Sequence, residues 1–227
     1  MPRPYFSVAI DGPSGAGKST LARRVAGEMD FLYVDTGALY RALGLLAVRM
    51  GVGPADGAGV EALLPRAEVT LTHEERGQRI FLCGEDVTEA IRAHEISRAA
   101  SDISALPAVR AFLLDIQRAF ARTRDVIMDG RDIGTVVLPG AALKIFLTAA
   151  PEDRARRRYE ELRMRGADIT YDQVLCDLLF RDRNDASRAA APLKPAADAV
   201  VLDTTGNTFE QSLRIILDLV RGLCSTK

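Results

Sequence analysis

Apolar positions along this 227-residue chain recur with two different periods, and the period indicates where strands and helices are expected. Short apolar runs rich in β-branched residues predict buried strands; they lie at 5–10, 31–34, 125–128, 143–148 and 199–202. Apolar residues at helical spacing predict helices; these lie at about 18–29, 39–50, 89–101, 107–121, 151–166, 170–187 and 209–223. Because strands and helices alternate, we expect an α/β fold whose parallel sheet is covered by helices on both faces.

The segment of about 62–90 interrupts this alternation. Two short strands, 69–72 and 79–82, are separated by polar residues around Gly77, which predicts an antiparallel hairpin, and Val87 is a candidate for a third strand. Four glycines and one proline between 51 and 59 predict a loop. We therefore expect a small antiparallel subdomain inserted into the α/β core.

Charge and cysteine content exclude several classes of protein. The formal net charge of −1 argues against wholesale nucleic-acid binding, which usually needs a basic domain. The three cysteines are scattered, so they form neither a metal-ligand spacing nor a disulfide framework, as suits a reducing cytosol. The first apolar run is too short for a signal peptide, and no run approaches a membrane span. We expect a cytoplasmic monomer with no nucleic-acid or membrane partner.

A glycine-rich loop follows the first predicted strand and precedes the first predicted helix. It matches the pattern Gly-x-x-x-x-Gly-Lys-[Ser/Thr], whose glycines let backbone N–H groups surround phosphate oxygens at a helix N-terminus. Its residues are Gly12, Pro13, Ser14, Gly15, Ala16, Gly17, Lys18 and Ser19. Lys18 would bind the β- and γ-phosphates, and the Ser19 hydroxyl would face Mg²⁺. A glycine-rich turn without a ligand is the alternative, but the strand–loop–helix setting favours nucleotide binding.

The residues after the loop favour a phosphotransferase among nucleotide-binding proteins. No Asn-Lys-x-Asp stretch is present to recognise guanine. The strand at 126–128 ends in Asp129-Gly130-Arg131-Asp132, which places an arginine beside carboxylates. Bringing two anionic nucleotides together requires positive charge, and phosphoryl transfer is catalysed mainly by positioning and electrostatics. Because the chain contains only four lysines, most of its arginines are alternatively ordinary surface cations.

Several stretches together resemble the bacterial cytidylate kinases, in order and over nearly the whole chain. They are Asp11–Lys18, Asp35–Arg41, Asp129–Val137, Arg154–Arg158 and Arg181–Leu193. The resemblance implies a P-loop kinase core at 1–35, 121–151 and 169–227. It further implies a monophosphate-binding domain at 36–120, with the insertion at about 62–90, and a short helical lid at 152–168.

The resemblance also implies a reaction, in which ATP with bound Mg²⁺ phosphorylates CMP or dCMP. Lys18, Asp129, Arg131 and Arg157 would form the catalytic group. The phosphate loop with Thr20 would bind ATP, covered by the lid arginines Arg154, Arg157 and Arg158. Because Ser19 stands where many family members carry Gly followed by Thr, either Ser19 or Thr20 can supply the magnesium-side hydroxyl, and the loop pattern favours Ser19.

The residues implied for the acceptor nucleotide fall into three groups. Asp132 would accept from the cytosine amino group, as carboxylates do when they recognise cytosine in DNA, while Arg110, Arg188 and the Thr36 hydroxyl would donate to the ring acceptors. Arg41 and Arg131 would hold the phosphate, since a planar guanidinium suits bidentate contact. The sugar would contact Ser101, Arg181 and Asp185.

Each of these assignments has a structural alternative. Arg131 and Asp132 can simply pair with each other, and Arg181 and Asp185 can form a surface pair one helical turn apart. The arginines at 154–158 can be an exposed helix face, and Thr36 can be a helix N-cap. For the whole chain, the alternatives are a P-loop kinase for UMP or a small metabolite, and a nucleotide-binding module without turnover.

Overall fold

The computed structural model describes residues 5–74 and 77–225. The chain divides into two compact units: unit 1 comprises Met1–Tyr33 and Thr123–Lys227, and unit 2 comprises Val34–Arg122. The domain limits expected from the sequence, including the lid at 152–168, stay predictions.

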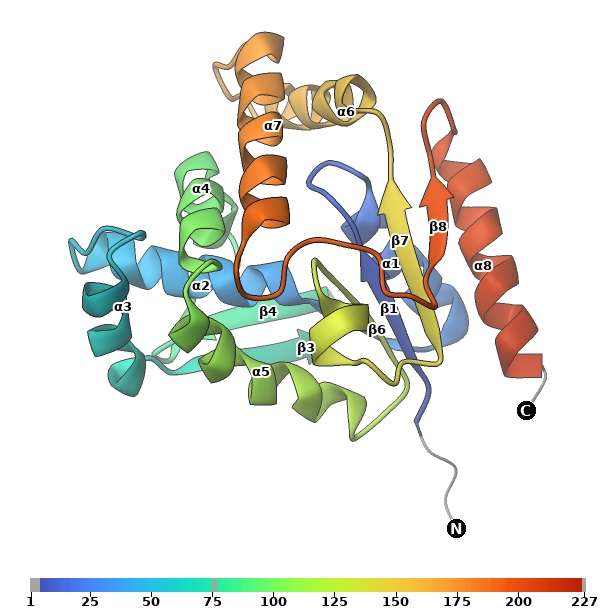
Figure 1. The fold of residues 1–227 in the computed structure, drawn as a ribbon, viewed down its shortest axis with the longest axis horizontal. Coiled ribbons are helices and arrows are strands. Elements are labelled where there is room, and N and C mark those ends of the chain that lie inside the picture. The colour runs from blue at the N-terminus through green and yellow to red at the C-terminus, as the bar shows by residue number, and fades with distance from the viewer. Residues whose placement is uncertain (1–4, 75–76, 226–227) are drawn as a thin grey trace. The chain divides into compact units, whose positions relative to one another are not determined.

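A five-stranded sheet with the order β2-β6-β1-β7-β8 forms the centre of the α/β core (Figure 1). Its strands are β1 (Ser7–Asp11), β2 (Leu32–Asp35), β6 (Val126–Gly130), β7 (Leu143–Thr148) and β8 (Val200–Asp203). β1 pairs in parallel with β6 and β7, and β7 pairs in parallel with β8. The carboxyl ends of β1 and β6 therefore lie side by side, which is where open α/β sheets bind ligands.

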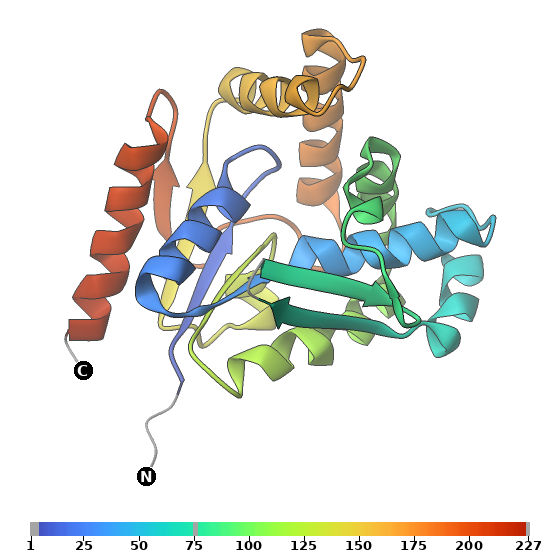
Figure 2. The same ribbon diagram turned by 180° about the vertical axis from the view of Figure 1, so that it is seen from behind.

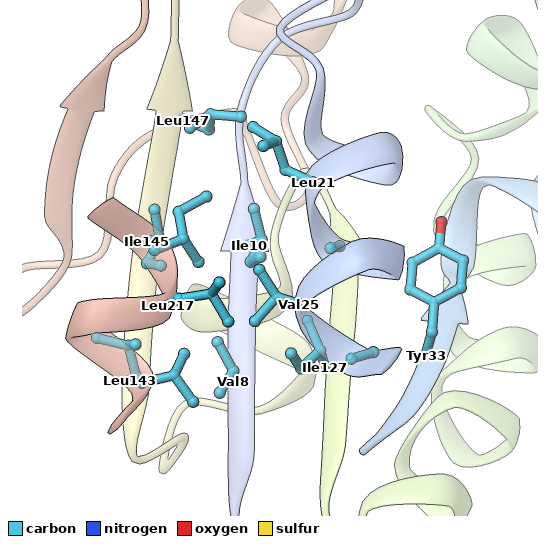
Figure 3. Close-up of a cluster of buried hydrophobic side chains, with 14 of the residues drawn as sticks. Val8, Ile10, Leu21, Val25, Tyr33, Ile127, Leu143, Ile145, Leu147 and Leu217 are labelled. Atoms are coloured by element: carbon cyan, nitrogen blue, oxygen red, sulfur yellow. The ribbon is translucent and has the colours of Figure 1, made fainter. Parts of the chain in front are cut away.

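The described part of unit 1 contains the α-helices α1 (Lys18–Met29), α6 (Pro151–Met164), α7 (Tyr171–Ser187) and α8 (Phe209–Ser225). α1 and α8 lie on the same face of the sheet (Figure 2). Val8 and Ile10 of β1, Val25 of α1, Ile145 of β7 and Leu217 of α8 pack into one buried cluster (Figure 3). The predicted α/β class, with a parallel sheet flanked by helices, is confirmed.

Two further segments of unit 1 lie outside this cluster. α6 and α7 pack together through an apolar cluster of their own, which contains Ala155, Leu162, Val174 and Leu178. A single turn of π-helix, η3 (Ile133–Val137), follows β6 and packs against β1.

Unit 2 combines helices with the small antiparallel sheet that the sequence predicts. Its helices are α2 (Thr36–Arg49), α3 (Gly57–Leu63), α4 (His94–Ile103) and α5 (Pro107–Ala121). Its strands are β3 (Val69–Glu74), β4 (Gly77–Leu82) and β5 (Glu85–Asp86), in the order β3-β4-β5. α2 packs closely on α4 at Gly44, where a Cβ atom would lie 3.2 Å from the backbone nitrogen of Ala100.

Side-chain caps explain two differences from the sequence prediction. The expected loop at 51–59 is wrong at its end, because Asp56 accepts from the backbone N–H of Gly59 and begins α3. α2 begins three residues earlier than expected, because Asp35 accepts from the N–H of Ala38. Thr36 is the first residue of α2, so the alternative in which Thr36 is the N-cap is wrong.

Two smaller differences fall between β4 and α4. The helix expected at 89–101 is a 3₁₀ turn, η2 (Ala90–Arg92), followed by α4. Val87 is buried but lies just beyond β5. The hairpin turn expected around Gly77 includes residues 75–76, which lie outside the described residues.

Candidate active site

The loop at 12–19 connects β1 to α1, and two of its glycines are required by close backbone packing. Gly12 has φ +149°, and a Cβ atom there would lie 1.9 Å from the carbonyl oxygen of Leu147. Gly15 has φ +74°, and its Cβ would lie 3.0 Å from the carbonyl oxygen of Arg154. An L side chain at either position would both strain the backbone and collide with β7 or α6. The sequence pattern therefore forms a compact loop at the N-terminus of α1, a favourable setting for phosphate.

Lys18 is the first residue of α1 and is only 5% exposed. Its Nζ donates to the carbonyl oxygen of Pro13 at 2.7 Å. Burial and the nearby charge of Arg131 lower the pKa of Lys18 to about 7, although Asp129 and Asp185 act in the opposite direction. An anionic ligand in the loop would supply negative charge that this buried ammonium needs.

Ser19 and Asp129 meet at the carboxyl end of β6. The Ser19 hydroxyl donates to Asp129 Oδ2 at 2.8 Å, and the Tyr33 hydroxyl donates to Oδ1 at 3.0 Å. Thr20 is exposed, so the geometry favours Ser19 as the magnesium-side hydroxyl. A hydroxyl beside a carboxylate suits Mg²⁺, which usually takes few protein ligands when it is bound with phosphates. Within residues 5–74 and 77–225, no group of three or more His, Cys, Asp or Glu side chains forms a separate metal site.

Asp185 joins two arginines in the interior of unit 1. Its carboxylate accepts from Arg131 Nε at 2.8 Å and lies 3.5 Å from Arg188 NH1. Burial raises the pKa of Asp185, but Arg131 and Arg188 outweigh it and lower the pKa below its ordinary value. Burial lowers the pKa of Arg131, but the charge of Asp185 and its hydrogen bond outweigh burial and raise this pKa above its ordinary value. The surface-pair alternative for Arg181 and Asp185 is therefore wrong, because Asp185 is buried and shared by other arginines.

Asp132 lies directly after Arg131 and is 4% exposed. Because Arg131 Nε donates to Asp185, the alternative in which Arg131 serves only to pair with Asp132 is wrong. Arg181 lies on α7 one turn before Asp185, and its charge helps to lower the pKa of Asp185.

The predicted lid arginines separate on α6. Arg154 is 4% exposed and donates to the carbonyl oxygens of Ala149 at 2.9 Å and Ser14 at 3.0 Å, while its NH2 pairs with Asp182 at 2.7 Å. This guanidinium contacts the backbone of the phosphate loop at Ser14, so the exposed-face alternative is wrong for Arg154. Its predicted contact with ATP in a closing lid stays a prediction.

The other two lid arginines are more accessible. Arg157 donates to the carbonyl oxygen of Thr204 at 2.8 Å, and Arg158 pairs with Glu161 at 2.7 Å. Their predicted contact with ATP phosphates stays a prediction.

The candidate acceptor residues of unit 2 lie on α2, α4 and α5. Thr36 is 2% exposed. Arg41 pairs with Asp35 at 2.7 Å, and its buried Nε has no hydrogen-bond partner. The same is true of the buried Ser101 hydroxyl. Arg110 donates to the carbonyl oxygen of Ser104 at 3.1 Å.

Unpartnered buried polar atoms cost about 1–3 kcal/mol each. Those on Arg41 and Ser101 therefore indicate where a polar ligand would be stabilised.

Unit 1 thus contains the phosphate loop together with Asp129, Arg131, Asp185 and Arg188. The other candidate residues for the acceptor, Thr36, Arg41, Ser101 and Arg110, belong to unit 2. Sequence reasoning assigned no role to several partners of these residues: Asp11, Tyr33, Asp35, Asp182 and Thr204. Asp11 was signalled by its place directly before the loop, and Asp35 by its place before a predicted helix. Thr204 carries no comparable local signal, and Asp182, although it lies in the stretch Arg181–Leu193, has none that would pair it with Arg154.

Among the helices that the structure describes, none is long and apolar enough to cross a membrane.

Known proteins similar to this chain agree with one another. Residues 8–222 match the cytidylate kinase family. A cytidylate kinase of Pelotomaculum thermopropionicum is 51% identical over 214 residues, covering 94% of this chain and 95% of that protein. A cytidylate kinase of Desulfitobacterium hafniense is 49% identical over 221 residues, covering 97% and 95%. A solved structure of an uncharacterized protein from Eubacterium ventriosum superposes with a TM-score of 0.53 at 8% identity, covering 95% of this chain and 98% of that one, which shows a shared fold alone.

Proposed function

The chain belongs to the cytidylate kinase family, and on this premise we propose that it transfers the γ-phosphoryl group of ATP to CMP or dCMP. The products are ADP and CDP or dCDP. The protein is a nucleoside monophosphate kinase, a phosphotransferase whose acceptor is itself a phosphate group.

The observation that carries this proposal is the charge arrangement at the carboxyl ends of β1 and β6. Lys18, Arg131 and Arg188 bring three cations to the same interior region, with Asp129 and Asp185 as the neighbouring carboxylates. Two nucleotides that approach each other through their phosphates need such fixed positive charge. A structural core alone would not justify the cost of so many buried charges.

Transfer needs no covalent intermediate and no strong general base, because the attacking oxygen of the acceptor phosphate is already anionic. Lys18 would follow the charge of the γ-phosphoryl group as it moves, and Arg131 would hold the acceptor phosphate beside it. Arg157 would approach the ATP phosphates from α6. Ser19 and Asp129 would hold Mg²⁺ bound with ATP, and the ion would offset part of the phosphate charge.

Recognition of the base is assigned to a carboxylate and to hydrogen-bond donors. Asp132 would accept from the cytosine amino group, while Arg110, Arg188 and Thr36 would donate to the ring acceptors. Uracil presents an acceptor where cytosine presents the amino group, so Asp132 would repel it. Burial of Asp132 supports this role, because a buried carboxylate that loses its partner penalises the wrong base strongly.

The phosphate and sugar of the acceptor are assigned to the remaining residues. Arg41 and Arg131 would bind the phosphate, and Ser101, Arg181 and Asp185 would contact the sugar. The unpartnered Ser101 hydroxyl and Arg41 Nε support their assignments, because a bound nucleotide would satisfy both atoms.

A coupled ADP-release assay with CMP, dCMP, UMP, AMP and GMP at fixed ATP and Mg²⁺ tests the proposal. We expect CMP to be preferred to UMP by at least about tenfold to a hundredfold in kcat/KM, about 1.4–2.8 kcal/mol. Asp132→Asn should reduce this preference, chiefly by loss of activity with CMP. Equal use of UMP would leave a nucleoside monophosphate kinase of another specificity, and no turnover with any acceptor would contradict the proposed reaction.

A further inference from the structure

Asp11 is the last residue of β1, directly before the phosphate loop, and the proposed reaction gives it no role. Its side chain is buried, with 4% of the residue exposed. Oδ1 accepts from the backbone N–H of Ile133 at 2.7 Å, and Oδ2 accepts from the N–H of Gly134 at 2.7 Å. Both carboxylate oxygens are therefore bound to one short segment, 122 and 123 residues further along the chain.

That segment is the π-helical turn η3, and Asp132 immediately precedes it. The carbonyl oxygen of Asp132 accepts from the N–H groups of Val136 at 2.8 Å and Val137 at 3.1 Å. The N–H on the other side of the same peptide bond belongs to Ile133 and donates to Asp11. The peptide group that follows Asp132 is thus held by the turn through its oxygen and by Asp11 through its nitrogen. Single π-helical turns are found frequently at functional sites.

Close packing leaves this turn little freedom on Asp11. A Cβ atom added at Gly134 would lie 3.3 Å from Asp11 Oδ2 and 3.2 Å from Cδ of Lys144. Both distances are tighter than ordinary van der Waals contact. The turn therefore lies directly on the carboxylate, and a displaced Asp11 would let it shift.

The charge of Asp11 is costly to maintain in this position. Burial raises the pKa of Asp11 to about 6, and the nearby charge of Asp132 adds to the effect, while the two N–H donors and Lys18 act in the opposite direction. A second carboxylate close to a buried one disfavours the charged form of the buried group. The two backbone N–H donors offset part of this cost, and they bind both oxygens of Asp11 to the turn that follows Asp132.

We propose that Asp11 is a positioning residue for base specificity, which fixes the backbone at Asp132 so that the Asp132 carboxylate is presented to the cytosine amino group. Because Gly12 follows Asp11 directly, Asp11 also connects the segment that contains Asp132 to the start of the phosphate loop. The inference rests on the proposed role of Asp132 in recognising cytosine.

Asp11→Asn is the direct test, because the amide keeps the size of the side chain but presents an NH₂ group to one of the two backbone N–H donors. We expect kcat/KM for CMP to fall by about tenfold, which corresponds to about 1.4 kcal/mol, and kcat/KM for UMP to change little. The CMP to UMP ratio therefore falls by the same factor, while KM for ATP changes by less than about twofold. A merely structural role would lower activity with both acceptors equally and leave the ratio unchanged.

Asp125→Asn is the matched control. Asp125 Oδ1 also accepts a backbone N–H, that of Phe6 at 2.6 Å, beside the opposite ends of β1 and β6. This variant also weakens a carboxylate contact to the backbone, directly before β1, and it should keep the CMP to UMP ratio. Gly134→Ala is the second variant, which displaces the turn without altering any charge, and it should also lower the ratio; it decides the question if Asp11→Asn does not fold.

The possible failures can be told apart. An unchanged ratio in Asp11→Asn and Gly134→Ala, with wild-type protein still selective for CMP, would overturn the positioning role alone. A wild-type protein that does not distinguish CMP from UMP would overturn the proposed cytosine recognition and the inference with it.

Discussion

Replacing Lys18 with methionine should stabilise the protein and inactivate it at the same time. Lys18 is 5% exposed, and burial and Arg131 lower its pKa from 10.5 to about 7. At about 1.36 kcal/mol for each unit, this difference is an upper limit on the order of 5 kcal/mol for the cost of keeping the ammonium charged in the fold. Methionine has a similar length and carries no charge, so Lys18→Met removes the cost and keeps the packing.

The stability gain should depend on pH in a defined direction. Below about pH 7 Lys18 is protonated in both the folded and the unfolded state, so the full cost is present. Between about pH 7 and 10.5 the unfolded chain binds more protons than the folded one, so wild-type stability rises with pH. The advantage of Lys18→Met should therefore be largest near pH 6 and smaller, by about 2–3 kcal/mol, at pH 9.

Urea denaturation followed by circular dichroism at pH 6 and pH 9 measures the stability, and the ADP-release assay measures kcat. Turnover should fall by at least about a hundredfold, because a preorganised charge is lost where the phosphoryl group moves. Lys144→Met is the control, since Lys144 is also buried but pairs with Asp198 at 2.8 Å, and its loss should not stabilise the protein. A Lys18→Met protein that is less stable at pH 6, or that keeps its kcat, would refute the reasoning.

Two further predictions concern groups that the structure isolates. Asp182→Asn removes the counter-charge of buried Arg154, so the free energy of unfolding in urea should fall by about 3 kcal/mol and KM for ATP should rise. Arg24→Gln is the control, because it breaks an exposed pair with Glu28 and should cost less than about 1 kcal/mol. Equal losses of stability in the two variants would contradict this account. Ser101→Ala removes a buried hydroxyl without a hydrogen-bond partner, so the free energy of unfolding should stay equal or rise by up to about 1 kcal/mol, while KM for CMP increases severalfold. Lower stability with an unchanged KM for CMP would assign Ser101 a structural role instead.

Local patterns sufficed wherever the chain needs only its neighbours to form a structure. The helix expected from Lys18 to Met29 has those bounds in the structure, and β7 lies at Leu143–Thr148 as expected. The phosphate loop was recognisable because its strand, glycines, lysine and helix are contiguous. The prediction was wrong at α3, because the glycines at 51–59 indicated a loop, whereas Asp56 caps a helix that buries Val60.

Tertiary structure alone decided which charged side chains work together. Arg154 and Arg157 lie three residues apart on α6, but one is buried against Ser14 and Asp182 and the other reaches Thr204. Local periodicity could not separate them, because it reports which face of a helix is apolar and not what the opposite face meets.

The role of Asp11 had the same origin. By itself the sequence determined a nucleotide-binding loop, an α/β core and the kinase family that the chain resembles. Only the tertiary structure, which places β1 between β6 and β7, brought the Asp11 carboxylate to the two N–H groups after Asp132. Strand order depends on the packing of the whole core, and contacts more than a hundred residues apart follow from that order and not from any local pattern.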